Sequence, residues 1–153
     1  MKKTNFRLKY FLVPLGTAFI VPSLIIFLLE VLVGRIPPLK SIQDIIYRQF
    51  AGGHNLFLLA LFGFIPFVLH IAVLFFCSFF VDSRRLNYLL WGGLTGTLIV
   101  MLCGHIIIWY PLYGPGHMSS TAVIGFLFIP FLCIPTMLIG TGVGWFLSKR
   151  PGN

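Results

Sequence analysis

Five ionisable side chains could do chemistry within or beside the apolar segments of this sequence: Glu30, His54, His70, His105 and His117. Imidazole and carboxylate groups carry protons and ligate transition metals, and polar groups inside a membrane are functional candidates because their burial is costly. Four of the five are expected toward one end of the molecule, which makes them the metal candidates: Glu30, His54, His105 and His117. They share no ligand spacing of the HxxxH or CxxC kind, so the alternative is that each makes an ordinary interfacial or interhelical contact.

His70 and His105 could also be read as a pair of axial haem ligands. Counted along their segments, the two imidazoles differ in depth by about 12 Å at about 1.5 Å per residue, which is too far apart for one iron. We therefore expect no cofactor, and we expect His70 to hydrogen-bond a neighbouring helix at Thr95 or Thr97.

Nucleophilic catalysis finds little support. Ser119 and Ser120 follow His117 closely, but a seryl nucleophile needs an oriented base and usually a buried carboxylate. The sequence places no carboxylate there. The sequence therefore favours a non-enzymatic protein.

Four apolar stretches must position these residues, over about 11–33, 56–81, 88–110 and 119–147. Each reaches the roughly 20 residues that a helix needs to cross about 30 Å of hydrocarbon. Only 9% of the 153 residues are charged and 58% are hydrophobic, whereas soluble domains carry about 25% charged residues. We expect an all-α, four-transmembrane-helix bundle in which residues 1–153 form one integral membrane domain.

The basic residues predict the orientation of the bundle. Eight lie on one side, in the N-terminal flank, the 82–87 connection and the C-terminal flank, and three lie on the other, in the 34–55 loop. Because cytoplasmic flanks are enriched in Lys and Arg, we expect both termini inside the cell. The net charge of +8 is spread over helix ends, which excludes a nucleic-acid-binding surface.

An amphipathic helix is predicted at 39–50, in the first outer loop. Its apolar face holds Leu39, Ile42, Ile45, Ile46 and Phe50. The charged side chains of Lys40, Asp44 and Arg48 fall on the opposite face, and Ser41 with Asp44 fits a capping box. Such a helix lies on the outer membrane surface or covers the bundle as a lid.

Small residues recur at helical spacing in the last two apolar stretches. The third carries Gly92, Gly96 and Gly104, and the fourth carries Thr136, Gly140 and Gly144. Small residues at intervals of four let helix backbones approach closely in lipid. We expect these residues to pack the two helices together or to serve a second chain. The 82–87 connection is expected to be a tight turn between antiparallel neighbours.

The leading hypothesis is a non-enzymatic, multi-pass protein of the bacterial inner membrane. It would act as a membrane-embedded binding or accessory subunit, through helix–helix contacts with a partner membrane protein or with copies of itself. The alternative is an oligomeric transporter of a small solute, ion or metal that uses Glu30, His70 and His105. A second alternative is a membrane enzyme at the outer leaflet.

Overall fold

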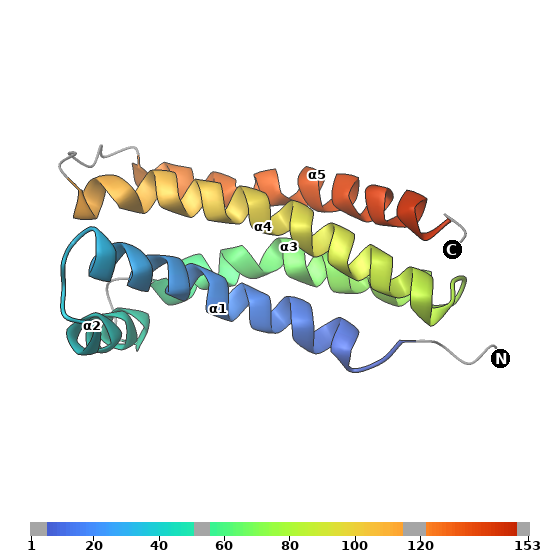
Figure 1. Ribbon diagram of the computed structural model, residues 1–153, viewed down its shortest axis with the longest axis horizontal. Coiled ribbons are helices and arrows are strands. Elements are labelled where there is room, and N and C mark those ends of the chain that lie inside the picture. Colours follow the sequence, from blue (N-terminus) through green and yellow to red (C-terminus); the bar gives the residue numbers. More distant parts are fainter. Residues whose placement is uncertain (1–5, 51–55, 115–121, 150–153) are drawn as a thin grey trace.

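The described residues form five α-helices and contain no strand, which confirms the all-helical expectation. A computed structural model describes residues 6–50, 56–114 and 122–149. The helices are α1 (Lys9–Leu32), α2 (Pro38–Phe50), α3 (Leu56–Cys77), α4 (Ser83–Tyr113) and α5 (Ala122–Ser148). Four of them run along the long axis of the molecule, and α2 is seen nearly end-on at one end of the bundle (Figure 1).

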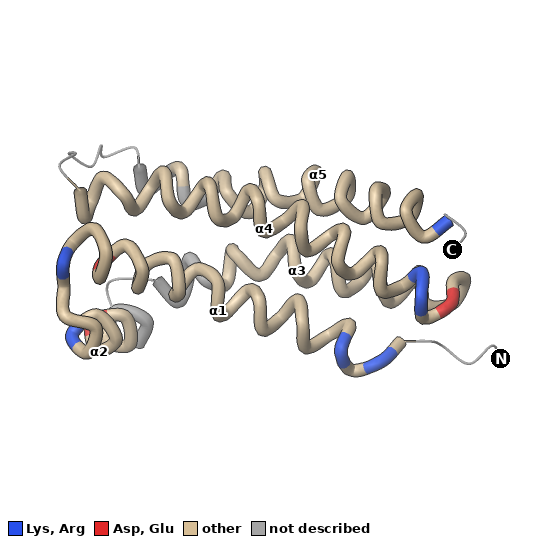
Figure 2. The backbone as a smooth tube through the Cα atoms, viewed as in Figure 1, with Lys and Arg blue, Asp and Glu red and all other residues tan. Residues whose placement is uncertain are grey.

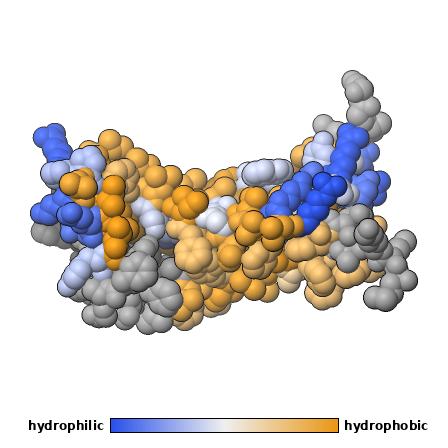
Figure 3. All heavy atoms as spheres, turned by 90° about the horizontal axis from the view of Figure 1, so that it is seen from below, coloured by the Kyte–Doolittle hydropathy of each residue, from blue (hydrophilic) through white to orange (hydrophobic). Residues whose placement is uncertain are grey.

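Three helical segments are long and apolar enough to cross a membrane: Lys9–Leu32, Ser83–Tyr113 and Phe128–Ser148. The described apolar part of α3, Leu61–Cys77, is shorter. An apolar belt separates the hydrophilic residues at the two ends of the molecule (Figure 3). These features indicate an integral membrane protein, because so wide an apolar surface is stable only in lipid.

The tightest packing joins α4 to α5. A Cβ atom added to Gly96 would collide with the carbonyl oxygen of Thr136, and one added to Gly92 would collide with that of Gly140. Near the end of α5, a Cβ on Gly144 would strike the carbonyl oxygen of Tyr88. The two backbones are therefore in direct contact, and the small residues of both helices are used within the chain.

Gly104 makes a looser contact on the same pair of helices. A Cβ there would lie 2.8 Å from a side-chain carbon of Ile129. Elsewhere α1 packs against α3 and α4, and α3 packs against α5.

The expected tight turn at 82–87 is wrong, because α4 begins at Ser83 and runs to Tyr113, well beyond the predicted 88–110. Asp82 is the N-cap, and its Oδ1 accepts the backbone N–H of Arg85 at 2.8 Å. An Asp that caps the orphan N–H groups of a first turn starts a helix where it stands. Correspondingly, α3 ends at Cys77 rather than at 81.

Helix α2 also differs in detail from its prediction. It begins at Pro38, so Ser41 lies in its first turn and does not cap it. Proline suits the first position of a helix because the missing N–H has no partner there in any case. Ser41 and Ile45 face the bundle and are buried, whereas Leu39, Ile42 and Ile46 are exposed.

Most of the basic residues of the described chain gather at one end of the bundle, with both ends of the chain (Figures 1 and 2). The buried Tyr10 ties α1 to α4 at this end. Its hydroxyl hydrogen-bonds the carbonyl oxygen of Ser83 at 3.2 Å and Oδ1 of Asn87 at 3.1 Å. The start of α1 is thereby fixed beside the start of α4.

Candidate functional site

Glu30 forms a polar node at the end of the bundle opposite the termini. Its side chain is fully buried. Oε2 accepts a hydrogen bond from the hydroxyl of Ser41 at 2.5 Å, and Oε1 accepts one from the hydroxyl of Tyr113 at 2.8 Å. The ring of Trp109 stacks on Tyr113 with centroids 6.3 Å apart. One carboxylate therefore joins α1, α2 and α4.

The backbone after α1 delivers Ser41 to this carboxylate. The N–H of Gly34 bonds to the carbonyl of Leu29 at 3.0 Å, and the N–H of Ile36 bonds to that of Glu30 at 3.0 Å. Between them, Arg35 has a φ of 53° in the left-handed region, where a non-glycine residue is uncommon. This reversal turns the chain back across the end of α1. The node ties helices together, and both carboxylate oxygens are already engaged by hydroxyl donors.

His70 lies at the junction of α3, α4 and α5 and is fully buried. Its Nε2 lies 3.3 Å from the carbonyl oxygen of Leu89, and its Nδ1 has no hydrogen-bond partner among the described residues. Gly93 leaves room for the ring, because a Cβ there would collide with it and lie 2.7 Å from Oγ1 of Thr141. The expected partners were Thr95 or Thr97, but Thr97 donates to the carbonyl of Gly93 within α4.

The candidate metal ligands do not form a cluster in the described part of the chain. His105 Nδ1 lies 2.8 Å from the carbonyl oxygen of Met101, one turn earlier in its own helix. Within residues 6–50, 56–114 and 122–149, no group of three or more His, Cys, Asp and Glu side chains comes together. His54 and His117 lie outside the described residues. Among the described residues, the structure places the Ser41 and Tyr113 hydroxyl groups on the carboxylate of Glu30.

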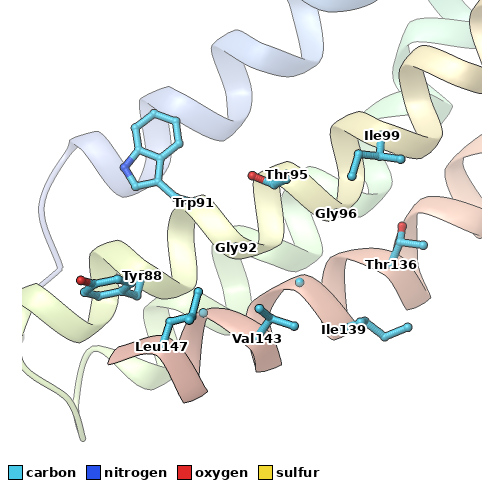
Figure 4. A pocket seen from close by; sticks show the side chains of 12 residues that line it. Tyr88, Trp91, Gly92, Thr95, Gly96, Ile99, Thr136, Ile139, Val143 and Leu147 are labelled. Atoms are coloured by element: carbon cyan, nitrogen blue, oxygen red, sulfur yellow. The ribbon is translucent and has the colours of Figure 1, made fainter. Parts of the chain in front are cut away.

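An apolar groove of about 530 Å³ runs along the outer side of the α4–α5 pair. Its floor is the glycine backbone where the two helices touch, and larger side chains form its walls. Figure 4 shows Tyr88 and Leu147 at one end of the groove and Ile99 and Thr136 at the other. The remaining lining residues are Trp91, Gly92, Thr95, Gly96, Ile139, Gly140, Val143 and Gly144.

Sequence reasoning missed three residues of these sites. Ser41 and Tyr113 were not recognised as partners of Glu30, and Gly93 was not recognised as the space for His70. The only available signal for Ser41 was a hydroxyl between the apolar and charged faces of α2, too weak to indicate a contact with α1.

No protein-family model, curated protein or solved structure matches this chain.

Proposed function

We propose that the chain crosses the bacterial inner membrane four times, with both termini in the cytoplasm. The packing supports a fourth span, because α3 lies alongside α1 and α5. The charge distribution supports the orientation, because the basic residues before α1, at the start of α4 and after α5 lie at the end that carries both termini (Figure 2). Basic residues at short flanks are retained on the cytoplasmic side.

Helix α2 then lies across the bundle axis, in the plane of the outer membrane surface. One side of the helix is fixed to the bundle by Ser41 and Ile45. A second side presents Leu39, Ile42 and Ile46, which are 70%, 46% and 53% exposed. An amphipathic helix in this position buries its apolar side at the boundary between headgroups and acyl chains.

We propose that this protein is a non-enzymatic accessory subunit that binds a partner membrane protein, or further copies of itself, through helix–helix contacts. The observation that carries this proposal is a set of open glycines. At Gly16 of α1, Gly63 of α3 and Gly142 of α5, an added Cβ atom would have nothing within 4 Å. Glycine in a helix interior is less stable than alanine by about 1 kcal/mol, and these three gain no packing in return from the described part of the chain. Close approach by another helix would supply it.

Bulky substitution of the open glycines tests this function. Gly16→Leu, Gly63→Leu and Gly142→Leu should each fold, because the Cβ atom of each new side chain has nothing within 4 Å. At least one should convert the native complex to the monomer, because leucine separates backbones that small residues allow to touch. The measurement is the particle size in mild detergent extracts of the source membranes, by size-exclusion chromatography with light scattering.

The matched control is the corresponding alanine variant at each position, which adds one methyl group and should keep the complex. A monomeric wild-type protein, or a complex that persists in all three leucine variants, would rule out helix-mediated assembly at these faces.

A further inference from the structure

We propose that the α4–α5 groove holds one anionic phospholipid from the leaflet at the basic end of the bundle. One acyl chain would lie in the groove, and the phosphate would sit beside Arg85 and Lys149. This site is separate from the open glycines and does not depend on the assembly proposed above.

The length of the groove matches one leaflet. From Tyr88 to Ile99 there are eleven helical steps, or about 16 Å at about 1.5 Å per residue, and Thr136 to Leu147 gives the same length on α5. One leaflet occupies about half of the roughly 30 Å hydrocarbon core. A groove of this length accommodates one acyl chain of one leaflet along its whole extent.

The shape and chemistry of the groove suit an acyl chain. Glycine Cα atoms form the floor, and the walls include Ile99 and Val143, which are 58% and 51% exposed. The groove runs along the helices, which is the direction in which lipid chains lie. A chain seated there fills a concave surface that the fold leaves open, and gains contacts on three sides.

Two cations, Arg85 and Lys149, lie beyond the lining residues at the basic end of the groove, and neither forms an ion pair with a described carboxylate. Arg85 precedes the lining residue Tyr88 by three positions, and Lys149 follows Leu147 by two. The guanidinium of Arg85 and the Nζ of Lys149 lie 5.9 and 5.5 Å from the ring centroid of Trp145. In the part of the chain that the structure describes, no carboxylate forms an ion pair with either residue. A phosphodiester anion would supply the missing negative charge.

The same charges argue against a second copy in the groove. Two parallel copies placed groove to groove would bring their basic ends, which carry Arg84 and Arg85, close together. Like charges opposed across an interface are repelled. An anionic lipid removes this conflict.

Native mass spectrometry of the purified, delipidated full chain tests the proposal. The probes are phosphatidylglycerol and phosphatidylcholine with identical chains, added at equal concentration. One phosphatidylglycerol should bind with clear preference. Replacing both cations, with Arg85→Gln and Lys149→Gln, should weaken its binding about thirtyfold, given two basic residues of ordinary interfacial strength. Val143→Trp should block the groove and remove binding of both lipids.

Two matched controls keep the result specific. Lys40→Gln removes a cation at the opposite end of the bundle, and Leu138→Trp adds the same bulk at a residue that is 52% exposed and does not line the groove. Both should bind phosphatidylglycerol as the wild type does. Chain-free glycerophosphoglycerol should not compete, since the acyl chain contributes to binding.

Several results would overturn the proposal: equal retention of the two lipids, a double cation variant with wild-type affinity, or unchanged binding by a folded Val143→Trp variant. Photocrosslinking from Ile139 in native membranes that captures a protein in place of lipid would also overturn it. These results leave the test of the open glycines unaffected, because no open glycine lines the groove.

Discussion

Gly96→Leu abolishes the folded protein, because the new side chain must enter space that the α5 backbone already occupies. A Cβ at this position alone would collide with the carbonyl oxygen of Thr136 and approach the N of Met137 to 3.4 Å. Overpacking a core usually destabilises by about 1–3 kcal/mol, and here the obstacle is backbone rather than a side chain that can rotate. We expect a loss above about 3 kcal/mol, enough to unfold a protein of ordinary stability.

Fluorescence-detected size-exclusion chromatography and thermal melting in detergent measure this effect. The variant should lose its monodisperse peak, and the matched Gly142→Leu variant on α5 should keep it, because Gly142 has open space around it. A Gly96→Leu protein that melts within a few degrees of the wild type would show that α4 and α5 do not touch as described.

Glu30→Ala destabilises the end of the bundle opposite the termini. The substitution removes the acceptor of both the Ser41 and the Tyr113 hydroxyl groups. A buried donor left without a partner costs about 1–3 kcal/mol, so two orphaned hydroxyls give an expected loss of up to about 6 kcal/mol. Part of that loss is recovered wherever a hydroxyl can turn to another acceptor.

Two further variants separate this node from general damage. Tyr113→Phe removes one donor and should cost about 1 kcal/mol, and Glu30→Gln should fall between the other two, because an amide keeps one acceptor and can donate to a hydroxyl. Thermal melting gives the ranking. In addition, hydrogen exchange of α2 should rise in Glu30→Ala, because Ser41 loses its attachment. Wild-type melting of Glu30→Ala would mean that the carboxylate does not hold α2.

Much of the fold follows from local patterns in the sequence. The apolar stretches predict long helices, because nothing else satisfies backbone groups over that length in lipid. The intervals of four between Gly92 and Gly96, and between Gly140 and Gly144, place small residues on one face of each helix. The pattern did not show which helix packs against these faces. In the structure the glycine face of α4 packs against the glycine face of α5.

The remaining features depend on contacts between distant segments. Glu30 and Tyr113 are 83 residues apart, so no local sequence pattern predicts their hydrogen bond. The start of α4 was misplaced because the polar run after Asp82 is equally compatible with a turn and with the first turn of a helix, and the cap decides between them. The groove could not be predicted from the sequence either, because it forms only where the two close-packed helices α4 and α5 meet.

The central claim is that the chain spans the membrane four times with its basic end in the cytoplasm, and cysteine labelling in intact cells tests it most directly. The background is a chain with Cys77, Cys103 and Cys133 replaced by alanine, into which Lys40→Cys, Arg84→Cys or Lys149→Cys is introduced. A membrane-impermeant maleimide should label position 40 in intact cells, and positions 84 and 149 only after permeabilisation. Labelling of 40 and 84 from the same side would contradict the claim, because α3 would then fail to cross.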